Sequence, residues 1–556
     1  MNSPRTNRIA DPKPIGPSIQ PPGPRPADRL TFGPLIALLL TVVATSAIRL
    51  RLLSMPLERD EGEYAYAGQL ILQGHPPYER LYNMKWPGTY YCYALFEAIF
   101  GQTIEGIHLG VLAINVIAIV LVFLICRRLL DPVAAAAAAV AYALLSLSPW
   151  TLGFAGHATH FVVLFALLGV LCLQRAIERQ RWSLYFLAGV FAGLAPIMKQ
   201  PGIVFPSFIL ADWAWHEAPG SWRPKLLRGS ALLAGMLAPF GVLFASLFAT
   251  HTSSAFWLWT ISYARYYGEP LNGKVFRNFA DAFGVVLGDG VVFWIVAGLG
   301  LLALPLSPRT RAAAPFLLAL LIASFLGVLP GLTFREHYFI LMLPAVAFLF
   351  GAAVFVVRHR LEPHFPKWAT ASAIAVVLIP LATAFGMEGS FYLTMKPEQA
   401  CRHVYQENPF IEAVAVADYI RARTHADDSI AVIGSEPEIY FYCQRPSATG
   451  FIYMYSLVEK QPYARQFQQQ MIREVEAARP KYVVFVNLKA SWLPPPNADM
   501  TVANWFVDYQ ARQLKLVGLV EVDRANRITY RWDDPDLSPH ENVRTVMTVY
   551  ERRSAP

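Results

Sequence analysis

Charged residues are scarce in this sequence. Asp, Glu, Lys and Arg together make up 15% of the 556 residues, whereas 55% are hydrophobic and 13% are aromatic. Soluble domains usually carry about a quarter charged residues, and the mean hydropathy here is +0.37. So little charge excludes a wholly soluble protein and indicates a polytopic membrane protein.

Cysteines, targeting signals and repeats are also few. Five cysteines in the whole sequence exclude a disulfide scaffold, although Cys401 and Cys443 lie in the same C-terminal region and could pair. Residues 1–30 lack the pattern of a cleavable signal peptide and are Pro-rich and polar, which indicates a disordered cytoplasmic tail. We find no internal repeat of the kind expected in secondary transporters.

Long apolar runs fill residues 31–386. A spanning helix needs roughly 20 mostly apolar residues. By that measure we expect about eleven spans. They lie near residues 32–48, 107–125, 133–149, 161–174, 183–198, 202–215, 230–250, 284–306, 313–330, 338–357 and 368–386.

Lys and Arg gather in alternate connections between these runs, for example at 127–128, 175–181 and 223–228. Positively charged loops stay in the cytoplasm. We therefore expect a cytoplasmic N-terminus, with the C-terminus and both long loops, 49–106 and 251–283, on the outer side of the membrane. Most of the surplus behind the net charge of +8 lies in these loops, so we expect contacts with membrane lipids and no nucleic-acid partner.

Residues 387–556 have the composition of a water-soluble domain. Segments with helical spacing alternate there with short β-rich runs. The β-rich runs lie at 429–434, 481–487, 515–522, 528–532 and 544–550. Alternation of helix and strand predicts an extracytoplasmic α/β domain.

Residues 58–91, directly after the first apolar run, carry the densest polar chemistry. Asp60 with Glu63 three residues later has the pattern of a capping box, which predicts Asp60 as the N-cap of a helix that runs to about Gln73. One carboxylate of the Asp60–Glu61 pair could also act as a general base on an acceptor hydroxyl. The two roles are compatible, because a cap fixes the geometry that a base requires.

Lys85 follows in the same loop, ahead of a Trp-Pro-Gly turn. A lysine beside Trp and Tyr is often only an interfacial anchor, but a cation fixed at headgroup level also suits a lipid phosphate. The aromatic run from Tyr90 to Phe100 is too short to span a membrane and predicts a juxtamembrane helix.

These residues resemble a known family. The string DEGEYAYAGQLILQG at 60–74, followed by PPY and KWPG, is similar to the first outer loop of the GT-C glycosyltransferases. The resemblance is to the bacterial branch related to protein O-mannosyltransferases and aminoarabinose transferases, which is glycosyltransferase family 39-like. Further matching motifs are GHATHFVVLF at 156–165, GLAPIMKQPG at 193–202 and REHYF at 335–339. The resemblance covers about residues 30–390. It implies a GT-C catalytic domain over 31–386 in a bacterial plasma (inner) membrane, followed by the extracytoplasmic α/β domain over 387–556.

The activity that the resemblance implies is inverting transfer of a sugar from a polyprenyl-phosphate donor to an acceptor hydroxyl at the outer face. Asp60, with Glu61 beside it, would be the catalytic acid pair, and Asp60 would take the proton from the acceptor. Fixed cations would stabilise the phosphate as it leaves. The candidates are Lys85 and Arg335, with Arg265 or Arg277 from the second long loop. The acceptor, whether a lipid, a glycan or a protein, stays open.

Other residues of these motifs, together with Tyr82 of the first long loop, are candidates for the substrate pocket. They are Tyr64, Tyr82, His157, His160, Lys199, Gln200, His337 and Tyr338. For Lys199 an interfacial anchor is equally plausible. His157 and His160 are spaced to share one helical face, but two histidines without a nearby acid are more often not a metal site. A divalent metal is therefore left open, and no metal ligand or other cofactor is assigned.

The main alternative is a lipid or glycolipid transporter or flippase without transferase activity. A transporter should place its binding residues near the bilayer midplane, whereas the polar residues here gather at one outer face. That distribution favours the enzyme.

Overall fold

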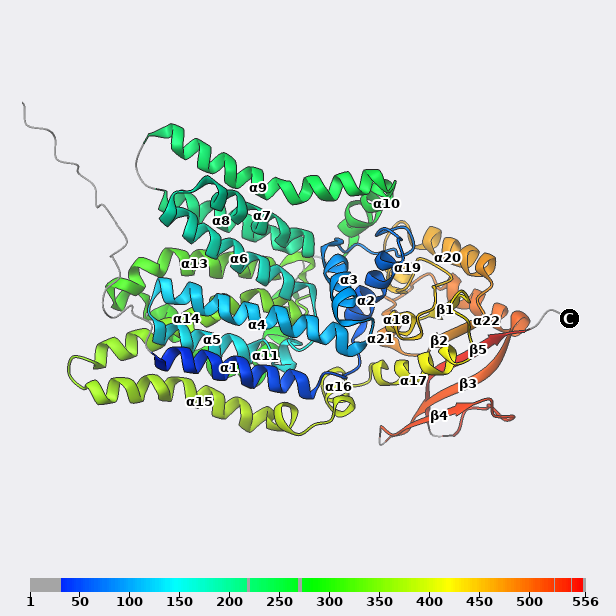
Figure 1. Cartoon of the computed structure of the whole chain (residues 1–556). Helices are drawn as coiled ribbons and strands as arrows, with labels where there is room; N and C mark the ends of the chain where they lie inside the picture. The colour runs from blue at the N-terminus through cyan, green and yellow to red at the C-terminus, as the bar shows by residue number, and fades with distance from the viewer. Residues whose placement is uncertain (1–31, 218–220, 269–272, 525, 542, 554–556) are drawn as a thin grey trace, which may run out of the picture.

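The computed structural model describes residues 32–217, 221–268, 273–524, 526–541 and 543–553. The expected tail at residues 1–30 lies outside these ranges. The described chain forms a bundle of helices at one end and a sheet with its own helices at the other (Figure 1).

The helices of the bundle lie side by side along its length (Figure 1). They are α1 (Phe32–Arg51), α4 (Ile104–Leu129), α5 (Pro132–Leu145), α6 (Ala158–Arg179), α7 (Trp182–Met198), α8 (Val204–His216), α9 (Trp222–Ala249), α11 (Val275–Leu287), α12 (Val291–Leu302), α13 (Pro308–Val328), α14 (Leu343–Leu361) and α15 (Pro366–Leu393). Short 3-10 or π-helical segments join them: η2 (Pro149–Thr151), η3 (Gln200–Ile203), η4 (Leu258–Tyr263), η5 (Ala264–Tyr266), η6 (Gly288–Gly290), η7 (Leu304–Leu306), η8 (Pro330–Leu332) and η9 (Glu336–Met342).

Eight helices of the described chain are long and apolar enough to cross a membrane. They are α1, α4, α6, α9, α13 and α15, together with Val275–Leu302 and Glu336–Leu361. The other three predicted spans are the shorter helices α5, α7 and α8, of 14, 17 and 13 residues. A 14-residue helix rises about 21 Å, less than the membrane core of about 30 Å. Eleven full-length spans are therefore not found in the described residues.

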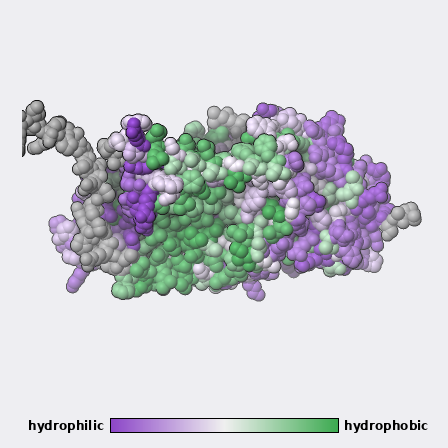
Figure 2. Space-filling model, turned by 45° about the horizontal axis from the view of Figure 1, so that its top comes forward, coloured by the Kyte–Doolittle hydropathy of each residue, from purple (hydrophilic) through white to green (hydrophobic). Residues whose placement is uncertain are grey.

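The outer helices of the bundle are apolar on their exposed sides. Figure 2 shows hydrophobic side chains over the bundle and hydrophilic side chains toward both ends. Glu336–Leu361, which contains α14, is 94% buried, whereas α15 is 17% buried and α1 is 22% buried over their most apolar windows. Exposed apolar helices around a buried apolar helix are stable only in a lipid environment, so the chain is a multi-pass membrane protein.

Short helices fill the space between the bundle and the sheet and cover the sheet (Figure 1). From the two long loops come α2 (Arg59–Leu72), α3 (Gly88–Phe100) and α10 (Ser253–Trp257). From the C-terminal part come α16 (Pro397–Tyr405), α17 (Phe410–Arg421), α18 (Glu438–Cys443), α19 (Tyr455–Val458), α20 (Ala464–Ala478), α21 (Lys489–Trp492) and α22 (Thr501–Gln513). The helix predicted from the aromatic run Tyr90 to Phe100 is present as α3.

The sheet has the strand order β1-β2-β5-β3-β4. Its strands are β1 (Ile430–Ile433), β2 (Tyr482–Val486), β3 (Leu514–Val522), β4 (Ile528–Trp532) and β5 (Arg544–Arg552). β1 and β2 pair in parallel, and the other neighbours are antiparallel. Each strand lies on a β-rich run that the sequence predicted.

The sequence left open whether Cys401 and Cys443 pair, and the structure shows no disulfide between them. Cys401 and Cys443 are both free thiols. They lie on different helices, α16 and α18, and each is buried in the packing of its own helix. Although both cysteines belong to the C-terminal region, their thiols are not paired.

Candidate active site

A cavity of about 580 Å³ lies where the first long loop meets the bundle and the C-terminal part. Asp60 and Tyr64 of α2 form part of its wall, and Lys199 comes from the turn between α7 and α8. His337 comes from η9, and Tyr453 from the segment before α19. Residues far apart in the chain therefore share one chamber at the end of the bundle that carries the sheet.

Helix α2 is capped by Glu58, not by Asp60. The Glu58 side chain accepts a hydrogen bond from the Glu61 N–H at 2.9 Å, and the Glu61 side chain accepts one from the Glu58 N–H at 3.3 Å. The predicted capping box is therefore displaced by two residues, because the Glu58 carboxylate reaches the N3 N–H group that a cap must satisfy. The helix ends at Leu72 with Gln73 as C-cap, as predicted. Asp60 lies in the first turn, with its carboxylate free of capping.

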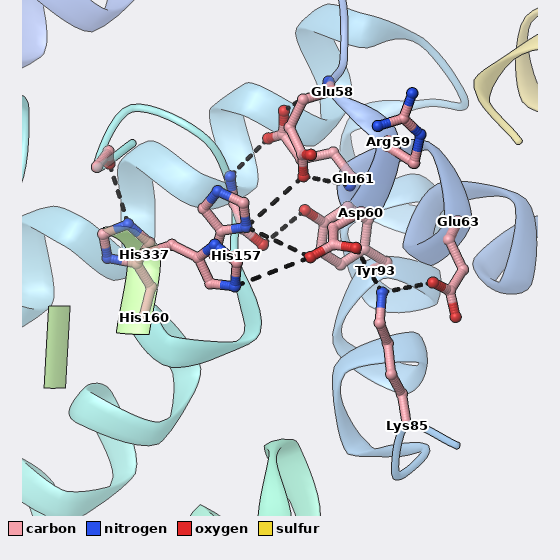
Figure 3. A network of polar contacts seen from close by, with 12 residues as sticks. Glu58, Arg59, Asp60, Glu61, Glu63, Lys85, Tyr93, His157, His160 and His337 are labelled. Atoms are coloured by element: carbon pink, nitrogen blue, oxygen red, sulfur yellow. Dashed lines mark hydrogen bonds and ion pairs between the residues drawn. The ribbon is translucent and has the colours of Figure 1, made fainter. Parts of the chain in front are cut away.

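Asp60 presents its carboxylate to the cavity with its side chain 25% exposed. Its Oδ1 accepts a hydrogen bond from Lys85 Nζ at 2.7 Å. Its Oδ2 lies 3.8 Å from His157 Nδ1 and 4.0 Å from His337 Nε2 (Figure 3). Burial is the largest single effect and raises the pKa of Asp60, but the Lys85 ammonium, together with His157 and Lys199, holds that pKa below its usual value. Asp60 is therefore ionised at neutral pH.

Lys85 bridges two carboxylates of α2. Its Nζ bonds to Asp60 and to the fully buried Glu63, and lies 4.6 Å from the centre of the Tyr64 ring. Glu63 also accepts a hydrogen bond from the Tyr90 hydroxyl at 2.5 Å. Burial would lower the pKa of Lys85, but the two carboxylates raise it well above its usual value. Asp60 and Glu63 share the cation because residues three apart lie on one helical face.

Glu61 turns away from the cavity. It is fully buried, its Oε1 accepts a hydrogen bond from the Gly156 N–H at 2.5 Å, and the same oxygen lies 3.5 Å from His108 Nε2. These contacts tie α2 to α4 and to the loop before α6. The structure therefore separates the predicted catalytic pair, with Asp60 on the cavity wall and Glu61 behind it.

The two histidines of the GHATH motif do not share a helical face. His157 is the extended N-cap residue of α6 and stacks on His337, with ring centres 4.1 Å apart and planes at 11°. His160 lies inside the helix and contacts the Gly153 carbonyl at 3.0 Å, outside the cavity wall. The predicted pairing failed because α6 begins at Ala158, between the two residues. Burial lowers the pKa of His157 to about 4, so its ring is neutral at pH 7.

Asp60, His157 and His337 are placed to hold a metal ion. One ligand atom from each lies within 4.8 Å of the others. Both ring nitrogens of His157 are buried and have no hydrogen-bond partner among the described residues. A carboxylate with two imidazoles suits Zn²⁺ or another divalent transition metal. The sequence placed no acid near the histidines, whereas the fold brings Asp60 beside them.

Two cations of the cavity wall, Lys199 and Arg335, have no ion-pair partner in the part of the chain that the structure describes. Lys199 Nζ lies 4.0 Å from the centre of the Tyr338 ring, and burial lowers the pKa of this lysine. Arg335 is exposed and directly precedes η9. Gln200 donates a hydrogen bond to the Met84 carbonyl at 2.6 Å, which joins the α7–α8 turn to the first long loop.

Of the remaining predicted site residues, one lies on the cavity wall and two lie on the protein surface. Tyr82 lines the cavity and stacks on Trp259, with ring centres 5.6 Å apart. Arg265 is exposed and lies over the Tyr266 ring, and Arg277 is exposed on α11. Neither of these arginines forms part of the cavity wall.

Sequence reasoning missed three contributors to the site. Glu58 caps α2, Glu63 shares Lys85, and Tyr453 approaches Asp60 from the C-terminal part. The spacing of Asp60 and Glu63 signals a shared face, which would have placed both carboxylates against one cation. Tyr453 has no local signal, since only the tertiary fold brings it to α2.

The architecture is that of the GT-C membrane glycosyltransferases, as the sequence motifs predicted. The structure is similar to that of ArnT from Cupriavidus metallidurans bound to undecaprenyl phosphate, with a TM-score of 0.59 and 16% identity over 90% of this chain and 99% of that chain. It is also similar to the oligosaccharyltransferase AglB from Archaeoglobus fulgidus in complex with an inhibitory peptide and a dolichol-phosphate. That comparison has a TM-score of 0.50 and 14% identity over 92% of this chain and 75% of that chain. At these identities the likeness establishes the fold.

Within this fold, residues 84–244 match the family model of the dolichyl-phosphate-mannose-protein mannosyltransferases. The matched segment includes Lys85, His157 and Lys199 from the cavity wall, whereas Asp60 precedes it. The sequence matches none of the curated proteins with which it was compared.

Proposed function

We propose that this protein is an inverting glycosyltransferase that moves a sugar from a polyprenyl-phosphate donor to an acceptor hydroxyl. The observation that carries the proposal is the Asp60–Lys85 pair on the cavity wall, with unpaired cations on the same wall. A carboxylate that can take a proton thus shares a chamber with cations that can hold a phosphate. The fold supports this donor class, since the ArnT structure holds undecaprenyl phosphate and the AglB structure holds a dolichol-phosphate.

In the proposed reaction, the cations place the donor. Lys199 and Arg335 have no carboxylate partner among the described residues, so a lipid phosphate supplies the missing negative charge. The acceptor oxygen forms a bond to the anomeric carbon while the bond from that carbon to the phosphate oxygen breaks. Attack and departure occur on opposite faces, which inverts the anomeric centre. The cations stabilise the charge that develops on the leaving phosphate.

Asp60 receives the proton of the acceptor hydroxyl. Because its pKa is held below the usual value, Asp60 is a weak base toward a neutral alcohol. Proton transfer is therefore late: it follows the formation of the new bond, which makes the hydroxyl strongly acidic. A leaving phosphate needs little protonation, so one carboxylate beside a group of cations is sufficient for this chemistry.

The proposal also states on which side of the membrane the site lies. The alternating basic loops support a cytoplasmic N-terminus, with the cavity and the C-terminal part on the extracytoplasmic side of a bacterial plasma membrane. The acceptor hydroxyl then belongs to a lipid, a glycan or a protein that reaches this side.

The test uses purified protein in nanodiscs with a panel of radiolabelled polyprenyl-phosphate sugars. Wild type is compared with Asp60→Asn, which keeps the size of the side chain and removes its charge. We expect donor binding to persist and sugar release or transfer to fall about 10²–10⁴-fold, the usual contribution of a general base. Asp418→Asn, on the exposed side of α17, is the matched control and should keep wild-type turnover.

Two further arms sharpen this experiment. Turnover that stops with EDTA and returns with Mn²⁺ or Zn²⁺ shows that transfer needs a divalent cation, for which Asp60, His157 and His337 are the candidate ligands. Turnover that is unchanged by EDTA would mean that Lys85, Lys199 and Arg335 stabilise the leaving phosphate without a metal ion. Movement of intact donor across the bilayer without sugar transfer would replace the transferase with the transporter alternative.

A further inference from the structure

Tyr453 brings the C-terminal part into contact with both members of the Asp60–Lys85 pair. It is 7% exposed, and its hydroxyl donates a hydrogen bond to the Arg59 carbonyl at 3.0 Å and lies 3.5 Å from Asp60 Oδ1. Its ring centre is 5.5 Å from Lys85 Nζ. The ring also stacks on Tyr455, with centres 5.6 Å apart and planes at 19°.

The side chain of Arg59, the residue directly before Asp60, also contacts the C-terminal part. Its guanidinium lies 5.9 Å from the centre of the Tyr455 ring and 3.0 Å from the fully buried Glu436 carboxylate. It also donates to the Ser435 carbonyl at 2.5 Å. The residue directly before Asp60 is therefore held by the C-terminal part through both its side chain and its carbonyl.

The rest of α2 lies directly against the C-terminal part. A Cβ atom added at Gly62 would stand 2.6 Å from the Glu438 Cβ, so no larger residue fits there without a shift. One turn later the Tyr66 hydroxyl accepts a hydrogen bond from the Ser447 N–H at 2.8 Å. Because α2 packs against the C-terminal part at both Gly62 and Tyr66, the position of this helix depends on the C-terminal part.

We propose that Tyr453 is a positioning residue for the transfer reaction, so that the C-terminal part completes the active site and does not merely cover it. This inference rests on the proposed function. The hydroxyl fixes the carbonyl of the first residue of α2 and so the direction of the Asp60 side chain. The ring keeps the Lys85 ammonium beside its two carboxylates. A small displacement of a reacting group lowers the rate steeply.

Tyr453 acts through Asp60 and Lys85 and does not transfer a proton itself. Its single hydroxyl proton is donated to the Arg59 carbonyl. Burial, together with the neighbouring carboxylates, holds the pKa of the phenol well above its usual value. The contribution of Tyr453 is therefore geometric.

Two substitutions separate the hydroxyl from the ring. Tyr453→Phe removes only the hydrogen bond and keeps the packing, whereas Tyr453→Leu also removes one of the two aromatic faces beside Lys85. Tyr66→Phe is the matched control, because it deletes another hydroxyl that joins α2 to the C-terminal part but belongs to a residue outside the cavity wall. All variants are studied as the full chain in nanodiscs.

The first readout is steady-state transfer. We expect Tyr453→Phe to lower kcat about tenfold with the donor KM nearly unchanged, as for loss of a hydrogen bond near a charged group. Tyr453→Leu should lower kcat further, with the donor KM still nearly unchanged, since the Lys85 ammonium loses one of its two aromatic contacts and keeps only that with Tyr64. Tyr66→Phe should change only the thermal midpoint. Equal losses of kcat in Tyr453→Phe and Tyr66→Phe, in step with stability, would make the role of Tyr453 merely structural and overturn the proposal.

The second readout does not depend on turnover. Acetylation of Lys85 by an amine-reactive reagent is followed by mass spectrometry of the digested protein. We expect the rate at Lys85 to rise about fivefold or more in Tyr453→Leu, because an ammonium that has lost a cation–π contact is less restrained, and to stay at the wild-type rate in Tyr66→Phe. An unchanged rate in Tyr453→Leu would contradict the inference. If wild type transfers no sugar from any donor, the proposed function fails, whereas the labelling still decides whether Tyr453 holds Lys85.

Discussion

The two charged parts of the cavity wall differ in how their charges are balanced. On α2 and in its loop, the carboxylates of Asp60 and Glu63 both accept hydrogen bonds from the Lys85 ammonium. On the α7–α8 turn and before η9, Lys199 and Arg335 have no carboxylate partner within the described chain. A cation that is paired with carboxylates is held in place before a substrate arrives, whereas an unpaired cation gains a partner only when an anion binds. The difference assigns the chemistry to α2 and recognition of the phosphate to the unpaired cations.

Removal of Lys85 should break the paired side and have the largest effect among the predictions that follow. We expect Lys85→Met to lower kcat/KM about 10²–10³-fold, as when one donor to a developing anion is deleted. The pH profile should change as well. Without the ammonium, burial dominates and raises the pKa of Asp60, so the base is protonated at higher pH.

The measurement is kcat/KM between pH 4.5 and 8 for wild type and the Lys85 variant. In wild type the pKa of Asp60 lies below its usual value, so the rate should not fall through protonation of this residue in that range. In Lys85→Met the acid limb should move upward by about one pH unit or more. Lys85→Arg keeps the charge and serves as the control. An acid limb at the same pH in wild type and Lys85→Met would show that Lys85 does not set the ionisation of Asp60.

The sequence predicted local elements of structure better than the features that only the tertiary fold decides. Local patterns predicted the end of α2 at Gln73, the helix α3 and all five strands, because spacing and turn residues specify such elements within a few positions. The start of α2 was placed wrongly, since Glu58 and Asp60 both head a capping-box pattern and only the fold selects between them. Composition also could not distinguish the short helices α5, α7 and α8 from full spans.

Contacts between distant segments were beyond the sequence. The sequence placed Asp60, Lys85, Lys199 and Arg335 on one outer face of the membrane, whereas the structure shows that all four line one cavity. Nothing local indicated that His337 would stack on His157 or that Arg265 would lie outside. Side-chain direction at such positions depends on packing between helices, which a single sequence does not display.

Removal of the unpaired cations should produce an intermediate effect confined to binding. We expect Lys199→Met and Arg335→Met each to raise the donor KM about tenfold with a smaller change in kcat, because each removes one charge-assisted contact to the phosphate. The matched control is Arg265→Met, which deletes an exposed arginine outside the cavity wall.

The measurement is donor KM together with equilibrium binding of polyprenyl phosphate alone. Both values should weaken in the two cavity variants and stay at wild type in Arg265→Met. If Arg265→Met weakened donor binding more than Arg335→Met, this assignment would be wrong. The phosphate would then be bound by the second long loop, which carries Arg265.

The smallest effect on transfer should come from Glu61, although it adjoins Asp60 in the sequence. Its carboxylate is buried behind the cavity wall, where it accepts hydrogen bonds from Gly156 and Glu58. Glu61→Gln keeps the shape and one oxygen acceptor but loses the charge, which costs about 1–3 kcal/mol of stability for a buried hydrogen bond to a charged group. We expect a lower thermal midpoint, with turnover per folded molecule within about threefold of wild type, since no contact in the cavity is removed.

Differential scanning fluorimetry and transfer assays on the same nanodisc preparation measure the two quantities together. Asp60→Asn should show the opposite pattern, with turnover lost and the thermal midpoint nearly kept, because its carboxylate is partly exposed and makes no cap. If Glu61→Gln abolished transfer without lowering the midpoint, the carboxylate behind the wall would have to reach the reacting atoms. A role for Glu61 only through the position of α2 predicts instead that its loss of activity follows its loss of stability.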